Sequence, residues 1–170
     1  LNKHLWKFSK LRPSNFPTVR IAQFASYLYQ SEATLSKILE SDNLEAVKNL
    51  FNIQASDYWT DHFLFGKESI SRVKKLGKTA FENIIINTIA PYFAFYARVK
   101  NKPEYMDKAL DWLMRTNPEK NNITKHWQQL GLNIENAFDS QALIQLKNLY
   151  CNTRKCLNCR IGNQVIQHKF

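Results

Sequence analysis

Apolar residues recur along this chain mainly at the spacing of helices rather than of strands. Within residues 17–30, Ile21, Phe24 and Leu28 lie three and four positions apart, which predicts an amphipathic helix. Similar spacing predicts further helices over residues 35–39, 44–51, 77–89, 92–100, 103–115, 123–130 and 139–150. We therefore expect an all-α fold, a compact bundle of about six to eight helices with a C-terminal cysteine-containing loop.

Two segments stand apart from this regular pattern. Residues 77–89 are apolar on nearly all sides, which predicts the central buried helix. Pro91 lacks a backbone N–H and its ring crowds the preceding turn, so we expect a kink or break near residues 88–90. The aromatic residues within 54–76 fit either a short strand or an aromatic helix, and the pattern leaves both open.

The charge of the chain is concentrated in its two ends. The chain has 24 lysine and arginine residues, 14 aspartate and glutamate residues, and a net charge of +10. No acid occurs before Glu32 and none after Asp139, so residues 32–139 are neutral overall. If the two ends meet, they form one positive face that favours a nucleic acid, an anionic surface or an acidic partner domain. Alternatively, the charge only limits self-association.

Several cations occur in settings that suit an anion. Arg12 and Arg20 flank a predicted helix start, where free backbone N–H groups favour a phosphate or a carboxylate. Lys74 and Lys75 precede the apolar helix, close in sequence to aromatic residues that could stack on bases. The expected nucleic-acid contacts are Arg12, Arg20, Lys74, Lys75, Arg154, Lys155 and Arg160. The alternatives are arginines that pair within the domain and lysines on an ordinary solvated surface.

The sharpest local motif is a group of cysteines with the spacing C-x4-C-x2-C, formed by Cys151, Cys156 and Cys159. Thiolates separated by two residues suit zinc or an iron–sulfur cluster. A closed site needs a fourth ligand, and His168 lies nine residues after Cys159. The alternatives are three reduced, packed thiols or a redox or disulfide role.

The sequence lacks a complete catalytic motif. It contains no G-x-S-x-G, H-E-x-x-H, Walker-type or G-x-G-x-x-G segment, so no enzyme activity is expected of this chain. Asp57 and Asp61 lie four positions apart, next to His62; on a helix the two carboxylates would share a face and could bind a cation, or they form an ordinary exposed cluster. No apolar run approaches the ~20 residues of a membrane span. An odd number of cysteines favours a reducing compartment, so we expect a cytoplasmic protein without a membrane partner.

Three segments together resemble a known family. Residues 12–23 (Arg-Pro-Ser-Asn-Phe-Pro and onward), 85–91 and 151–162 are similar to the C-terminal half of the bacterial domain-of-unknown-function family 2851. The resemblance runs over nearly the whole chain. It implies that a preceding domain is missing, one whose Gly-Asp-x-Glu-x-His segment looks like a restriction-endonuclease-type nuclease core. Nothing in this chain matches that segment, so the resemblance assigns no catalytic residue.

These observations favour a non-catalytic accessory module. The length of 170 residues suits a single helical domain over residues 1–170, and the start at Leu1 rather than methionine suggests a fragment. The leading hypothesis is electrostatic nucleic-acid binding through a basic face. The rival hypothesis is a protein-interaction or structural domain that docks on the missing N-terminal, nuclease-like domain through exposed apolar surface.

Overall fold

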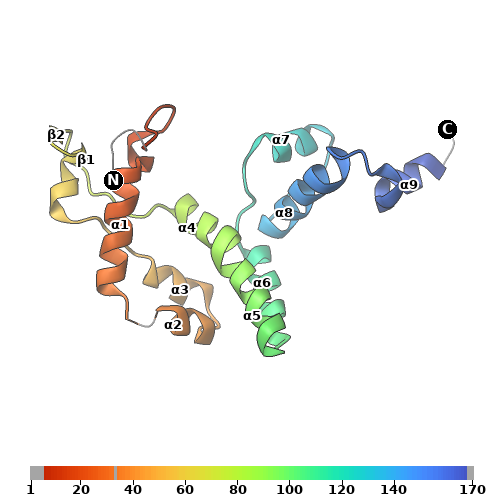
Figure 1. The fold of residues 1–170 in the computed structure, drawn as a ribbon, viewed down its shortest axis with the longest axis horizontal. Helices are drawn as coiled ribbons and strands as arrows, with labels where there is room; N and C mark the ends of the chain where they lie inside the picture. The colour runs from red at the N-terminus through yellow and green to blue at the C-terminus, as the bar shows by residue number, and fades with distance from the viewer. Residues whose placement is uncertain (1–5, 33, 168–170) are drawn as a thin grey trace. The chain divides into compact units, whose positions relative to one another are not determined.

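The structure, a computed structural model, describes residues 6–32 and 34–167. The chain divides into two compact units, Leu1–Phe81 and Glu82–Phe170, and we describe each unit by itself. Apart from one small hairpin, the regular elements described in both units are helical (Figure 1). The predicted all-α fold class is confirmed, and the single-domain assignment stays a prediction. Among the described residues, no helix has the length and apolar character needed to cross a membrane.

The first unit is built around α1, Pro17–Gln30, which follows a 3₁₀ turn at Pro13–Asn15. Pro17 occupies the first helical turn, where its fixed φ and missing N–H carry no penalty. Helices α2, Thr34–Glu40, and α3, Leu44–Leu50, come next. The side chain of Asn43 caps α3 by accepting the Glu45 N–H at 2.9 Å.

The segment left open by the sequence contains both a helical turn and strands. A 3₁₀ turn covers Asp57–Thr60, and a short antiparallel hairpin pairs β1, His62–Leu64, with β2, Lys67–Glu68. Gly66 sits in the hairpin turn with φ +64, a conformation that glycine adopts without steric cost. Strand β1 lies against α1 (Figure 1).

The buried face of α1 differs from the one that the apolar spacing suggests. Val19 and Ala22 are buried in the core of the first unit with Trp59. In contrast, Ile21, Phe24 and Leu28 are 47%, 58% and 59% exposed. The helix is therefore where the sequence predicts it, but its larger apolar side chains face outward.

The second unit begins within α4, Lys78–Ile84, and continues into α5, Ala90–Lys100, through a π-helical segment at Ile85–Ile89. The Ala90 N–H donates to the Ile85 carbonyl, five residues back. This wider turn directly precedes Pro91, where a regular helix would be disturbed. The sequence therefore locates the disturbance correctly, and it takes the form of a π-turn rather than a break.

The core of the second unit lies where α5 packs against α6, Glu104–Arg115. Phe93 is fully buried, and its ring meets that of Trp112 edge-on at a centroid distance of 4.9 Å. Helices α7, Asn122–Gln129, and α8, Ala137–Leu146, complete this core. Trp127 donates its indole N–H to the Leu143 carbonyl at 3.2 Å.

The C-terminal segment continues in short helical turns. A π-helical turn covers Lys147–Cys151, a 3₁₀ turn covers Cys156–Asn158, and α9 covers Arg160–Gln167. Residues 152–155 and Cys159 lie outside these helical elements, and Arg154 has a positive φ of 53°. The expected cysteine-containing loop is therefore short.

Candidate functional site

A pocket of about 500 Å³ in the first unit brings together cations that are far apart in the sequence. It is lined by Arg12 and Ser14 from the segment before α1, by Val19 and Gln23 of α1, and by Phe63 of β1. Its remaining wall is the basic stretch before α4. That stretch contributes Arg72, Val73, Lys74 and Lys75. None of the described residues that line the pocket is acidic, so it suits an anion.

Buried hydrogen bonds fix one wall of this basic pocket. Gln23 is only 3% exposed and donates its side-chain amide to the Lys74 carbonyl at 3.1 Å. Its amide oxygen accepts a hydrogen bond from Arg20 at 2.9 Å. Arg20 also donates to the side chain of Asn15 at 2.7 Å. These bonds tie α1 to the basic stretch and to the turn before α1.

Lys74 is the most deeply buried cation of the pocket. It is 6% exposed, its ammonium group donates to the Thr60 carbonyl at 2.6 Å, and it lies 4.2 Å from the centre of the Phe63 ring. Burial lowers the pKa of Lys74, an effect partly opposed by the negative charge of Asp61. The side chain therefore acts as part of the pocket wall, whereas Arg12, Arg72 and Lys75 are exposed.

Lys74→Met is expected to leave the free energy of unfolding within about 1 kcal/mol of the wild-type value, or above it, because it removes a buried charge at similar volume. The Thr60 carbonyl keeps a partner, since it also accepts the Arg72 N–H at 2.7 Å. Lys74→Asp, by comparison, should cost about 3 kcal/mol or more by burying an uncompensated carboxylate. Urea unfolding measures both variants. Equal losses for the two variants would contradict this expectation and show that the ammonium group of Lys74 itself stabilises the fold.

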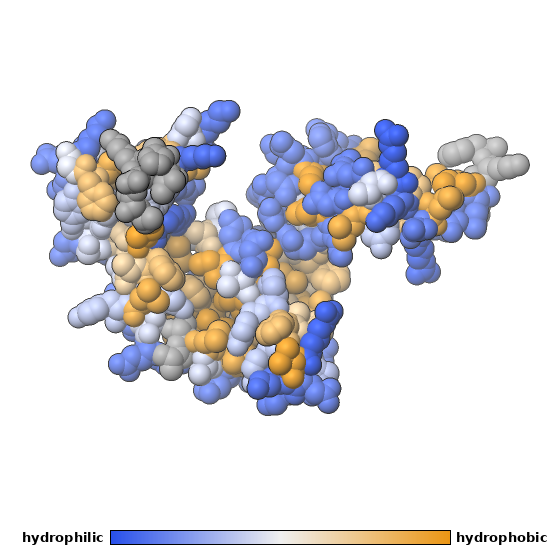
Figure 2. Space-filling view, in the orientation of Figure 1, coloured by the Kyte–Doolittle hydropathy of each residue, from blue (hydrophilic) through white to orange (hydrophobic). Residues whose placement is uncertain are grey.

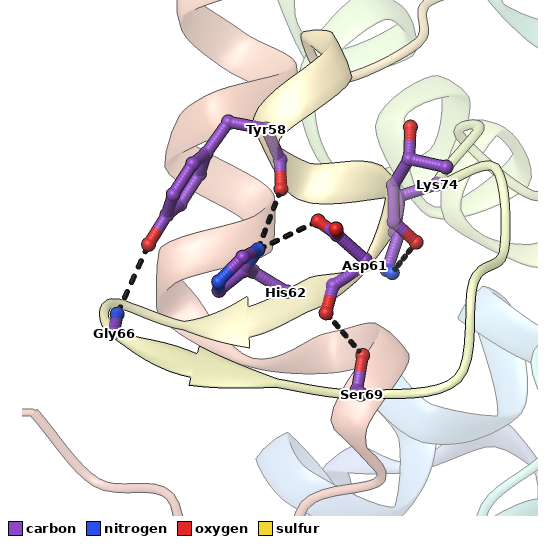
Figure 3. A network of polar contacts seen from close by, with 7 residues as sticks. Tyr58, Asp61, His62, Gly66, Ser69 and Lys74 are labelled. Atoms are coloured by element: carbon purple, nitrogen blue, oxygen red, sulfur yellow. Dashed lines mark hydrogen bonds and ion pairs between the residues drawn. The ribbon is translucent and has the colours of Figure 1, made fainter.

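A polar network holds the hairpin beside this wall (Figure 3). The Nδ1 atom of His62 lies 3.0 Å from the Tyr58 carbonyl and 2.6 Å from a carboxylate oxygen of Asp61. Both partners are acceptors, so Nδ1 carries the proton. Ser69 donates its hydroxyl to the Asp61 carbonyl at 2.9 Å, and the Gly66 N–H donates to the Tyr58 hydroxyl at 3.0 Å. Asp61 and His62 are therefore explained by the hairpin structure.

The hydrogen bond from His62 holds the pKa of Asp61 below its ordinary value of 3.8. The stabilisation from Asp61 is therefore fully present above that value, and it is lost as the pH falls through the lower folded-state pKa. Asp61→Asn should flatten this part of the pH dependence. Urea midpoints measured between about pH 2.5 and pH 6 test this, and parallel curves for both proteins would contradict it.

The structure brings together some, but not all, of the cations expected from the sequence. Arg12, Lys74 and Lys75 line one pocket with Arg72. Arg20 does not line it, but supports its wall through Gln23, and burial lowers the pKa of Arg20. Arg154, Lys155 and Arg160 are exposed in the second unit. That the two basic ends form a single face stays a prediction.

The three cysteines are free thiols in the second unit. Cys151 and Cys156 are exposed, and Cys159 is half-buried directly before α9. Over residues 6–32 and 34–167, no three histidine, cysteine or acidic side chains gather into a group that could hold a metal. His168 lies outside the described residues. Binding of zinc or an iron–sulfur cluster by these four residues therefore stays a prediction.

In the cysteine segment, Gly162 of α9 lies so close to the backbone of Cys156 that no side chain fits between them. A Cβ atom added at Gly162 in α9 would lie 2.6 Å from the Cys156 carbonyl oxygen. Gly162→Ala should therefore destabilise the packing of α9 on the Cys156–Asn158 turn by about 1–3 kcal/mol. Faster alkylation of half-buried Cys159 is the expected readout. Gly77→Ala is the matched control, because its added Cβ meets nothing within 4 Å; equal alkylation rates in both variants would contradict the prediction.

Comparison with known proteins adds one assignment. A family model described as "Protein of unknown function (DUF2851)" matches residues 1–122. The match covers the basic pocket and ends before the cysteine motif, so the resemblance expected over nearly the whole chain is supported for this part. No curated protein and no solved structure matches the chain. The chain therefore belongs to the family of proteins of unknown function DUF2851.

Proposed function

We propose that this chain is a non-catalytic module that binds the phosphate backbone of nucleic acids through the basic pocket. The observation that carries the proposal is the convergence of four cations on one pocket with no described acid in its lining. Arg12, Arg72 and Lys75 are exposed, so their charges are available to phosphates. The hydrogen bonds of Gln23 fix the wall that carries Lys74 before any ligand arrives, which lowers the ordering cost of binding.

The chemistry of the pocket favours phosphate over a smaller anion. Guanidinium groups donate paired hydrogen bonds that match phosphate oxygens, and lysines add point charges. A volume of about 500 Å³ exceeds the needs of a single small ion. In this proposal, the exposed cations of the second unit, Arg154, Lys155 and Arg160, add further phosphate contacts along the strand.

A direct binding measurement tests this proposal. Fluorescence anisotropy of a labelled oligonucleotide should give a dissociation constant of about 1–100 μM at physiological salt, the range of non-specific binding. An unlabelled oligonucleotide of the same length and unrelated sequence should compete equally, because phosphates carry no sequence information. The proposal fails if no binding is detected at protein concentrations up to about 1 mM.

Exposed apolar surface favours a second candidate function, docking on another protein domain. On α1, Ile21, Phe24 and Leu28 are exposed at helical spacing, which is typical of an interaction surface. Helix α9 also exposes apolar side chains, among them Ile161 and Val165 (Figure 2). If the exposed apolar face of α1 drives association, the double variant Phe24→Ser with Leu28→Ser should abolish concentration-dependent self-association in sedimentation experiments. Unchanged oligonucleotide affinity in the same variant would separate the two functions.

A further inference from the structure

A second pocket in the first unit has a different character from the basic pocket. It has a volume of about 780 Å³. Helix α1 contributes Thr18, Ile21 and Ala22, and the hairpin contributes Leu64, Phe65 and Lys67. Its other lining residues are Trp6, Phe8 and Trp59. We call it the aromatic pocket, because four of these nine described residues carry aromatic rings.

Two aromatic rings of this pocket, Trp59 and Phe65, are held by neighbouring groups before any ligand binds. Trp59 is 7% exposed and belongs to the core of the first unit. The ring of Phe65 meets Trp59 edge-on at 5.0 Å and lies near-parallel to Tyr58 at 6.1 Å. The Gly66 N–H bond to the Tyr58 hydroxyl anchors the hairpin turn beside Phe65 (Figure 3). Even so, Phe65 stays 75% exposed, so one part of an ordered ring faces solvent.

The charge at the aromatic pocket narrows the class of ligand. Lys67 is exposed and lines the pocket, and none of the described lining residues is acidic. A purely apolar partner surface would gain no binding free energy from a lysine at this position. A nucleotide would gain binding free energy from two contacts, because its base stacks on the aromatic rings and its phosphate pairs with the nearby cation.

We propose that the aromatic pocket takes an unpaired nucleobase, so that this chain prefers single-stranded to duplex nucleic acid. This inference rests on the proposed function, and it names the class of nucleic acid that the module binds. Bases in a duplex are stacked on one another inside the helix, and flipping one out costs energy. A single strand presents its bases freely to a ring such as Phe65.

Three ligands test the inference. They are a single-stranded oligothymidylate of about 12 nucleotides, an abasic strand of the same length that keeps its phosphates, and a duplex. At one salt concentration, the wild-type protein should bind oligothymidylate about 5- to 150-fold more tightly than the abasic strand, the range for stacking of one base. The duplex should also bind more weakly than oligothymidylate, even though its phosphates are more closely spaced.

Variants at Phe65 test whether the aromatic pocket is the source of the preference for oligothymidylate over the abasic strand. Phe65→Ala should reduce the preference for oligothymidylate to within about twofold of the abasic strand, whereas Phe65→Trp should keep it. Phe95→Ala is the control, because Phe95 on α5 is also exposed, at 61%, but lines no part of this pocket. Thermal unfolding of each variant checks that the fold is retained, as expected for an exposed side chain.

The outcomes separate the inference from the function on which it rests. Equal, salt-sensitive binding of all three ligands would overturn base stacking and leave phosphate binding standing. Absence of binding to any ligand would overturn both. If Phe65→Ala keeps the wild-type preference for oligothymidylate, the aromatic pocket does not bind the base and the inference fails. If Phe65→Ala alters self-association but not ligand preference, the pocket belongs to a protein partner and the inference fails.

Discussion

Reversing two charges at the basic pocket, Arg12→Glu with Lys75→Glu, is expected to weaken oligonucleotide binding by about 10- to 100-fold at physiological salt. Both side chains line the pocket and both are exposed. The substitutions therefore remove two phosphate partners and add two repulsive charges without disturbing the buried wall at Gln23 and Lys74. Affinity should fall for every sequence tested, because the lost contacts are with the backbone. Fluorescence anisotropy measures the change.

A matched control variant distinguishes the effect of the pocket charges on affinity from the effect of the net charge of the chain. Lys37→Glu with Lys125→Glu changes the net charge by the same amount at exposed positions on α2 and α7. Neither residue lines the basic pocket. The control should change affinity by less than about threefold, because neither side chain lines the pocket and salt weakens the effect of exposed charges that do not contact the ligand. Equal weakening by both double variants would show that total charge, rather than the pocket, attracts the ligand.

Trp112→Ala is expected to have the largest effect on stability, a loss of about 3–5 kcal/mol in the free energy of unfolding. Trp112 is 1% exposed and lies against the fully buried ring of Phe93. Its removal deletes a large buried ring and leaves a cavity where α5 packs on α6. A loss of this size is comparable with the whole stability of many domains, so part of the variant should be unfolded at ambient temperature.

Urea unfolding followed by circular dichroism measures this loss. Trp112→Phe keeps a ring in the same space, so it should cost less than Trp112→Ala. Tyr29→Ala is the surface control: Tyr29 is 94% exposed, and a change within about 0.5 kcal/mol is expected. A loss below about 1 kcal/mol for Trp112→Ala would contradict the position of this side chain at the centre of the core.

The positions of the helices could be predicted from the sequence, because apolar spacing and helix-start residues act over only a few positions of the chain. The apolar spacing around Ile21 and the proline at position 17 each act within a few residues. The position of the disturbance at Pro91 was predicted for the same reason. Its π-helical form could not be predicted, because a widened turn and a kink both accommodate a proline ring and the lost N–H donor, and the sequence does not distinguish them.

The buried face of α1 depends on contacts that the sequence does not reveal. Phe24 is more hydrophobic than Gln23, so the pattern favours burial of Phe24. In the fold, Gln23 is buried because the Lys74 carbonyl and Arg20 satisfy its amide. The Lys74 partner lies 51 residues away along the chain. Such a long-range pairing overrides local hydrophobicity and leaves Phe24 exposed.

In the candidate site, too, individual residues could be predicted from the sequence, but their long-range arrangement could not. Arg12, Lys74 and Lys75 were identified from the sequence as cations in suitable settings, but their convergence on one pocket depends on how α1 packs against the hairpin. Arg72, which also lines the pocket, was not among the contacts expected from the sequence. The aromatic pocket was not predicted, because Trp6, Trp59 and Phe65 are separated in sequence and only the hairpin turn at Gly66 brings Phe65 to the rim.

The most direct test of the central claim is the salt dependence of oligonucleotide binding. Plotting the logarithm of the association constant against the logarithm of salt concentration between about 50 and 200 mM reports how many phosphates the protein neutralises. The account predicts a steep line for the wild-type protein, with a slope of about −2 to −3 from the three exposed cations of the basic pocket, Arg12, Arg72 and Lys75. The Arg12→Glu, Lys75→Glu variant should give a slope shallower by about two. A flat line, or equal slopes for both proteins, would contradict binding of the phosphate backbone by this pocket.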